Sequence, residues 1–140
     1  MKVINRKFGI LGMARSGFSA AVKIKELGGI AFISEKRAES EITNSKRIKD
    51  SFQCEFGGHT EKLLNNEVLI LSPGIPGNIP IFKEAEKQNI EIISEIEFSF
   101  RIKHPHSKII AITGSNGKST TVSLIHHILQ TAGYNSVLAG

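Results

Sequence analysis

The sequence predicts an α/β protein, with a Rossmann-like doubly wound parallel sheet followed by the opening β–loop–α–β unit of a second α/β domain. Short apolar runs alternate with amphipathic helical patterns along the chain, which is typical of β-α-β units. The runs are apolar almost throughout, as in 67–72, which indicates parallel strands buried on both faces. Small glycine-containing turns follow several of these runs, at the edge where such sheets bind ligands.

The elements of the first sheet follow each other in a regular order. Strands are expected at 7–12, 30–34, 54–56, 67–72 and 91–94, and helices at 16–27, 39–51, 80–88 and 95–102. Gly28 and Gly29 end the first helix, because glycine readily adopts the left-handed conformation that closes a helix. Pro80 suits the first turn of its helix, where its missing N–H is not needed.

HPHS at 104–107 is the best candidate for a linker. We therefore expect a first domain at 1–106 and the start of a second at 107–140. The second contains a strand at 108–113, a P-loop, a helix at about 118–132 and a last strand at 136–139. One β–P-loop–α–β unit cannot cover both faces of a sheet. We expect this incomplete domain to pack on the first one or to exchange between two chains as a dimer.

The composition is that of a globular protein, with 40% hydrophobic and 22% charged residues among 140 and a net charge of +5. No apolar run approaches the length of a bilayer span, so no membrane partner is expected. The basic residues are scattered and no aromatic stacking platform accompanies them, so no nucleic acid is expected either. The single cysteine, Cys54, fits a reducing cytoplasm.

GMARSG at 12–17 has the spacing of G-x-G-x-x-G, with Ala14 in place of the middle glycine. In that motif the glycines let backbone N–H groups at a helix N-terminus approach a pyrophosphate. Glu35 ends the second strand, where such folds often place an acid against a ribose hydroxyl. Lys36 and Arg37 beside it could meet a phosphate or a base. A tight turn without a ligand is the alternative.

LSPGIPG at 71–77 follows the fourth expected strand. The carboxyl ends of parallel strands share one edge of a sheet, so Ser72 and the backbone of Gly74 would face the same region as GMARSG. A simple turn is equally compatible with this segment.

TGSNGKST at 113–120 has the flanking elements of a phosphate loop, a strand before it and a helix after it. The loop is a short variant of the P-loop pattern, because Gly114 lies only three residues before Gly117. Lys118 would bridge terminal phosphates and Ser119 would ligate Mg²⁺. The backbone N–H groups between the two glycines would wrap the phosphates.

The candidate phosphate loop lacks acidic partners. A carboxylate from another strand normally helps to hold Mg²⁺, yet residues 98–140 contain no Asp or Glu. His126 and His127 are adjacent on the following helix and point about 100° apart, so we expect structural roles rather than a shared metal site.

Together these motifs resemble the Mur ligases, the ATP-dependent amino-acid ligases of peptidoglycan synthesis. The resemblance rests on GMARSG, SPGI (72–75), NIEIISEIEF (89–98) and AITGSNGKST (111–120), and it extends over essentially the whole chain. It is closest to the branch that adds D-glutamate.

The resemblance implies that the first domain holds the UDP end of UDP-N-acetylmuramoyl-L-alanine. The pyrophosphate would lie over 12–17, the uridine beside 72–74 and the uracil among 35–37. The implied substrate-binding residues are Gly12, Ala14, Arg15, Ser16, Gly17, Glu35, Lys36, Arg37, Ser72, Pro73 and Gly74. Ala14 and the pair Glu35-Lys36 depart from the family pattern. Arg15 has no family role, and we expect it to reach the pyrophosphate.

The resemblance also implies ATP and Mg²⁺ as cofactors. ATP would convert the alanyl carboxylate into an acyl phosphate, which the amine of D-glutamate then attacks. The implied ATP-binding residues are Gly114, Ser115, Asn116, Gly117, Lys118, Ser119 and Thr120, with Lys118 catalytic and Ser119 on Mg²⁺. The family's other catalytic groups lie further along its chain, so we expect residues 1–140 alone to be inactive.

Two other functions stay open at this stage. The first is a Rossmann-type binding module for NADP or a UDP-sugar without ligase activity; Lys36 and Arg37 favour NADP, because an Arg at this position can accept a 2′-phosphate. The second is a small kinase or other P-loop NTPase, which the missing carboxylates after Glu97 disfavour.

Overall fold

The structure, a computed structural model, describes residues 1–13 and 15–139, with Arg15 described by its backbone alone. The chain divides into two compact units, Met1–Lys103 and His104–Gly140. Among the described residues, no helix combines the length and apolarity that crossing a bilayer requires.

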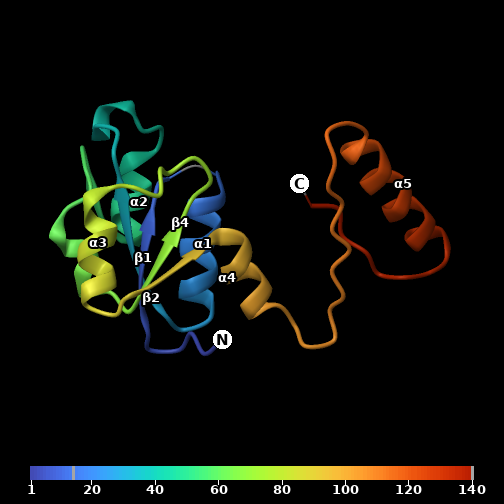
Figure 1. Cartoon of the computed structure of the whole chain (residues 1–140), viewed down its shortest axis with the longest axis horizontal. Coiled ribbons are helices and arrows are strands. Elements are labelled where there is room, and N and C mark those ends of the chain that lie inside the picture. Colours follow the sequence, from blue (N-terminus) through green and yellow to red (C-terminus); the bar gives the residue numbers. More distant parts are fainter. Residues whose placement is uncertain (14, 140) are drawn as a thin grey trace. The chain divides into compact units, whose positions relative to one another are not determined.

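The first unit is built on a five-stranded parallel sheet (Figure 1). Its strands are β1 (Lys7–Leu11), β2 (Ile30–Glu35), β3 (Gln53–Phe56), β4 (Val68–Leu71) and β5 (Glu91–Ser94), in the spatial order β3-β2-β1-β4-β5. Strand β1 lies between β2 and β4, so the order of the strands reverses there. In open α/β sheets this reversal is where ligands bind, outside the carboxyl ends of the strands.

Helices cover both faces of this sheet, as the sequence predicts for a doubly wound fold (Figure 1). The helices α1 (Arg15–Glu26), α2 (Ser45–Ser51) and α4 (Glu95–Ile102) contribute to one buried cluster, and α3 (Pro80–Lys87) with the 3₁₀ helix η2 (Glu61–Asn65) contributes to the other. Ile10 belongs to the first cluster and Leu11 to the second. Successive side chains of a strand point to opposite faces, so a run apolar at every position needs two such layers.

The continuous helix expected at 39–51 is wrong. A 3₁₀ turn, η1 (Glu39–Glu41), and the separate helix α2 occupy this segment, and Asn44 between them has a left-handed φ of 63°. The Glu41 carboxylate accepts a hydrogen bond from the Ala38 N–H at 2.8 Å, which closes the first turn on itself. The turn buries no residue and α2 buries only Ile48, so little packing holds the segment in one helix.

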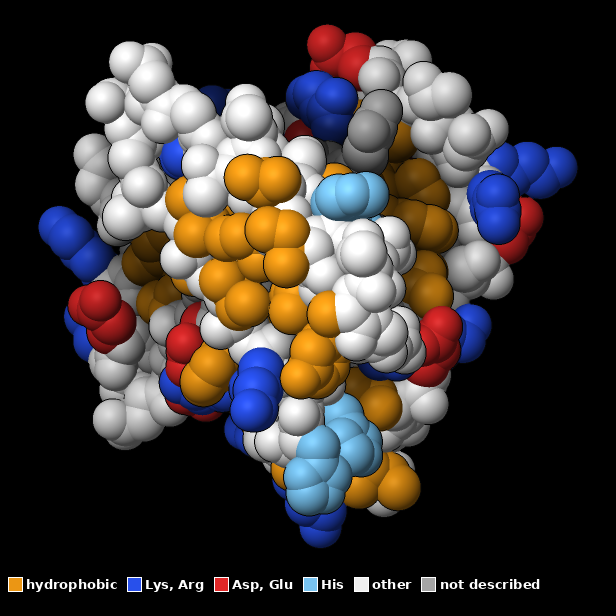
Figure 2. All heavy atoms as spheres, turned by 90° about the vertical axis from the view of Figure 1, so that its right-hand side faces the viewer, with side chains coloured by type: hydrophobic (Ala, Val, Ile, Leu, Met, Phe, Trp, Pro, Cys, Tyr) orange, Lys and Arg blue, Asp and Glu red, His pale blue; other side chains and the backbone are white. Residues whose placement is uncertain are grey.

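The second unit contains the expected helix, α5 (Lys118–Thr131). The strands expected at 108–113 and 136–139 are wrong, because neither segment forms a strand in the described residues. A strand satisfies its backbone N–H and C=O groups through a neighbouring strand, and these segments pair with none. Several large hydrophobic side chains of the unit are exposed: Ile109, Ile110, Leu124, Ile128, Tyr134, Val137 and Leu138. Figure 2 shows hydrophobic side chains gathered on the face that it turns to the viewer.

Candidate functional site

Two glycines shape the turn from β1 into α1, because a larger residue would not fit at either position. Gly12 has a φ of 90°, in the region that favours glycine, and a Cβ at Gly17 would collide with the carbonyl oxygen of Gly12. The loop therefore turns sharply and α1 begins directly against it. Ser16 is exposed in the first turn of α1. The predicted roles of Ala14 and the Arg15 side chain lie outside the described residues.

Ser72 joins the loop after β4 to the loop after β1. Its buried hydroxyl lies 2.5 Å from Glu95 Oε1 and 3.2 Å from the carbonyl oxygen of Gly12. The two loops that the sequence predicts to act together are thus held side by side, with the buried carboxylate of Glu95 beneath them. Pro73 and Gly74 are exposed next to this link.

Glu35 at the end of β2 is fully engaged by the protein itself. Its carboxylate accepts from the Met13 N–H at 2.8 Å, the Arg37 N–H at 3.0 Å, and Arg37 Nε and Nη2 at 3.1 Å each. Burial alone would raise the pKa of Glu35, but the hydrogen bonds from Arg37 and Met13 outweigh it and lower the pKa from 4.5 to about 2. Glu35 therefore stays ionised and ties the loop after β1 to the loop after β2.

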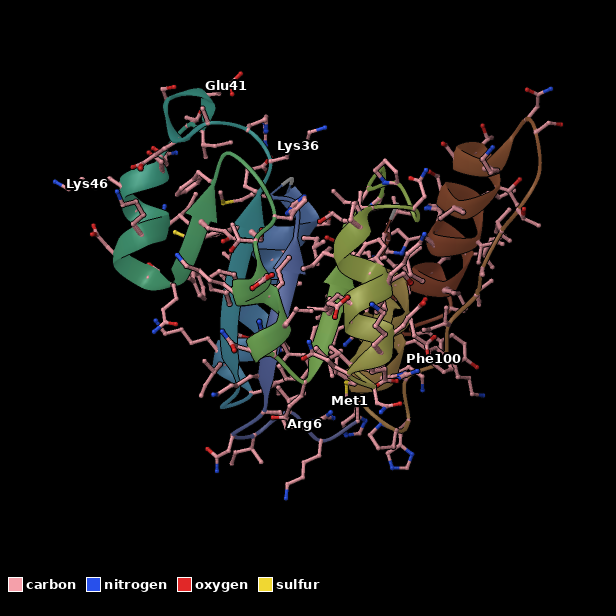
Figure 3. All side chains as sticks on the ribbon, turned by 60° about the vertical axis from the view of Figure 1, so that its left-hand side comes forward. Met1, Arg6, Lys36, Glu41, Lys46 and Phe100 are labelled. Carbon is pink, nitrogen blue, oxygen red and sulfur yellow. The ribbon has the colours of Figure 1, made fainter. Side chains whose placement is uncertain are left out.

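Lys36 and Arg37 differ in whether the protein already engages their charge. The Arg37 side chain is 52% exposed but folds back onto Glu35. Lys36 is exposed, and Figure 3 shows its side chain projecting at the end of the sheet opposite Arg6. Lys36 is therefore the cation of this segment that a bound anion or carbonyl could recruit without breaking an ion pair.

The sequence reasoning missed a second polar cluster at the same edge of the sheet. The Ser34 hydroxyl lies 2.6 Å from Glu55 Oε1 and 2.8 Å from His59 Nδ1, and Thr60 donates to Glu55 through its N–H at 3.0 Å and its hydroxyl at 2.5 Å. Ser34 and Glu55 are buried. The one feature of the sequence that could have indicated this cluster is Glu55, which lies inside the short strand β3. A carboxylate buried in a strand needs hydrogen-bond partners.

The candidate phosphate loop of the second unit has the backbone of a glycine-dependent turn. Gly114 and Gly117 have φ values of 148° and 76°, and Gly117 is the N-cap of α5. Lys118 Nζ donates to the carbonyl oxygens of Gly114 at 2.6 Å and Ser115 at 3.3 Å, so its ammonium lies over the loop. Ser119 and Thr120 are exposed in the first helical turn, where free N–H groups favour anions.

The same unit holds a hollow of about 870 Å³ between α5 and the segments on either side of it. Val122, Ile125 and Leu129 line it together with His126, whose Nδ1 lies 2.9 Å from the Ser136 hydroxyl. Among the described residues, no group of three or more His, Cys, Asp or Glu side chains could hold a metal ion.

Comparison with known proteins identifies the family. Residues 6–94 match the model of the Mur ligase MurD-like, N-terminal domain, which covers more than half of the chain. The chain belongs to the MurD-like Mur ligases. A family member from Cytophaga hutchinsonii, UDP-N-acetylmuramoylalanine--D-glutamate ligase, is 43% identical over 138 residues, which are 98% of this chain and 31% of the relative. The protein of the same name from Bacteroides thetaiotaomicron is 44% identical over 132 residues, 94% of this chain and 29% of the relative.

Two solved structures share the fold of this chain. A murein peptide ligase from Psychrobacter arcticus has a TM-score of 0.64 and 19% identity, over 92% of this chain and 27% of that one. UDP-N-acetylmuramate-alanine ligase from Thermotoga maritima has a TM-score of 0.58 and 23% identity, over 92% of this chain and 30% of that one. The chain thus spans about a third of the length of its relatives, and its family and α/β class agree with the sequence prediction.

Proposed function

We propose that this chain is the N-terminal part of an ATP-dependent ligase that adds D-glutamate to UDP-N-acetylmuramoyl-L-alanine in the cytoplasm. The observation that carries the proposal is the match of 98% of the chain, at 43% identity, to a relative whose name states this reaction. In this proposal, unit Met1–Lys103 binds the UDP end of the substrate and unit His104–Gly140 contributes the phosphate loop of the ATP site.

The arrangement of three loops supports the assignment of the first unit. The loops after β1, β2 and β4 lie at one edge of the sheet and are joined by Glu35 and Ser72. Exposed groups remain for the ligand: Ser16 on the helix that begins there, Lys36, and the backbone of Pro73 and Gly74. We assign the pyrophosphate to Gly12–Gly17 and the uridine to Lys36 and 72–74, with Glu35 bracing the loops rather than contacting the ligand.

The second unit is proposed to hold the phosphates of ATP through the 114–117 loop, Lys118 and the first turn of α5. ATP supplies the phosphoryl group that activates the alanyl carboxylate. Lys118 places a positive charge over the loop, where it would offset charge on the transferring phosphate. Ser119 would provide one oxygen ligand to Mg²⁺. Residues 98–140 supply no carboxylate, so we expect the chain alone not to turn over.

An NADP-binding module is the second candidate, and the geometry disfavours it. The cation that would meet a 2′-phosphate, Arg37, is already paired with Glu35, whose negative charge would repel that phosphate. Calorimetric titration of the chain with UDP-N-acetylmuramoyl-L-alanine and with NADPH separates the two. We expect binding of the first ligand only. Binding of NADPH alone contradicts the proposal. D-glutamate-dependent phosphate release by this chain contradicts the expectation that the chain alone does not turn over.

A further inference from the structure

His59 lies on a loop that is fixed beside the segment 35–37. The loop follows β3, so it leaves the sheet at the same edge as the loops after β1, β2 and β4. The Gly57 N–H donates to the Arg37 carbonyl at 2.9 Å, and the Gly58 N–H donates to the Glu35 carbonyl at 3.3 Å. The His59 ring is therefore held next to the residues assigned above to the nucleoside.

The protonation of the His59 ring follows from its neighbours. Ser34 has a single hydroxyl proton and lies within hydrogen-bond distance of both Glu55 and His59 Nδ1. Burial alone would raise the pKa of Glu55, but hydrogen bonds from Ser34 and Thr60 bring it below the ordinary value, so this carboxylate only accepts. Ser34 donates to Glu55 at 2.6 Å, and His59 Nδ1 must then carry the proton that it shares with the Ser34 oxygen.

A neutral imidazole protonated on Nδ1 has a lone pair on Nε2. Burial lowers the pKa of His59 and outweighs the carboxylates of Glu55 and Glu35, so the ring is neutral at physiological pH. Among the described residues, every buried side-chain nitrogen and oxygen has a hydrogen-bond partner. His59 is half-buried and its Nε2 contacts no such partner, so Nε2 reaches solvent. The sheet edge thus presents an acceptor of fixed tautomer.

We propose that His59 Nε2 reads the nucleobase by accepting a hydrogen bond from the N3–H group of uracil. The inference rests on the proposed function, which brings a UDP-linked substrate to this edge. Uracil carries N3–H between two carbonyl acceptors, whereas cytosine has a lone pair at N3 and would set acceptor against acceptor. The Lys36 ammonium acts electrostatically on the His59 ring and supplies a donor for a uracil carbonyl. The preferred ligand class is a pyrimidine-2,4-dione nucleotide.

The test is a calorimetric titration of UDP and of CDP into the chain and its His59→Phe variant, which keeps a ring of similar shape without the acceptor. We expect the unmodified chain to prefer UDP by about tenfold or more, and His59→Phe to lose about tenfold in UDP affinity with CDP affinity unchanged. His59→Gln, which retains an acceptor, should keep part of the preference. His106→Phe in the exposed segment 104–107 is the matched control and should change neither affinity.

An unchanged UDP-to-CDP ratio in a folded His59→Phe variant overturns the role of His59 and leaves the proposed function standing. Failure of the unmodified chain to bind UDP and UDP-N-acetylmuramoyl-L-alanine overturns both. Nitrogen NMR of the unmodified chain provides a readout that no folding defect affects. We expect a protonated Nδ1 and an unprotonated Nε2 whose resonance moves on addition of UDP but not CDP. A protonated Nε2, or one that UDP does not move, refutes the inference.

Discussion

Replacing Glu35 by Gln tests the brace between the loops after β1 and β2. The substitution keeps the shape of the side chain but removes the charge that holds Arg37 and the Met13 N–H. The pKa of Glu35 falls from 4.5 to about 2, and at about 1.4 kcal/mol per pKa unit this difference corresponds to about 3 kcal/mol. Because the Arg37 side chain is 52% exposed, solvent screens part of the interaction, and we expect a loss of about 2 kcal/mol at pH 7.

The stabilisation that Glu35 provides should disappear as the pH is lowered. A carboxyl group whose pKa is lowered by folding stabilises the folded state fully above about pH 5, and this contribution declines as the pH falls towards 2. The free energies of unfolding of the unmodified chain and of Glu35→Gln should therefore converge between pH 5 and pH 2. Urea unfolding followed by far-ultraviolet circular dichroism measures both, since the chain contains no Trp to serve as a fluorescent probe.

Glu84→Gln is the matched control. It removes a carboxylate from an exposed ion pair with Lys87, and such pairs contribute about 0.5 kcal/mol. The reasoning is refuted if Glu35→Gln costs no more than this control at pH 7. It is also refuted if the stabilities of Glu35→Gln and the unmodified chain stay parallel from pH 7 down to pH 3.

Three further substitutions test the loops around the two candidate sites. Gly17→Ala should lower the free energy of unfolding by about 1–3 kcal/mol in urea, because the new Cβ would collide with the Gly12 carbonyl oxygen. Gly77→Ala is the control and should change little, because the space around Gly77 is open. Ser72→Ala should cost about 1–3 kcal/mol in the same assay by leaving the buried Glu95 carboxylate without its partner, and an unchanged midpoint would argue against the link between the loops. Lys118→Ala should weaken ATP binding about tenfold in a calorimetric titration. It should not change stability, because Lys118 donates only to exposed loop carbonyls. An equal loss of ATP affinity in Lys108→Ala would instead indicate a non-specific effect of positive charge.

Much of the first unit was predictable because its signals are local and agree with each other. The strands β1, β2 and β4 are apolar at most positions, and the neighbouring helices begin and end at residues such as Pro80 and Gly28. The strands expected at 108–113 and 136–139 have similar apolar character but did not form. A strand depends on a partner strand for its backbone hydrogen bonds, and no local pattern states whether that partner is present.

The sequence by itself determined the fold class, the family and the loops that meet at one edge of the first sheet. Only the tertiary structure decided how their side chains are used. The Glu35 carboxylate accepts hydrogen bonds from Met13 and Arg37, and the Ser72 hydroxyl donates to Glu95. The contact with Ser34 fixes the tautomer of His59. These partners lie as far as 25 residues apart along the chain, and hydrogen bonds are specific to distance and direction. Residue type and spacing identify groups that could bind a ligand, but only packing shows which of them remain free to do so.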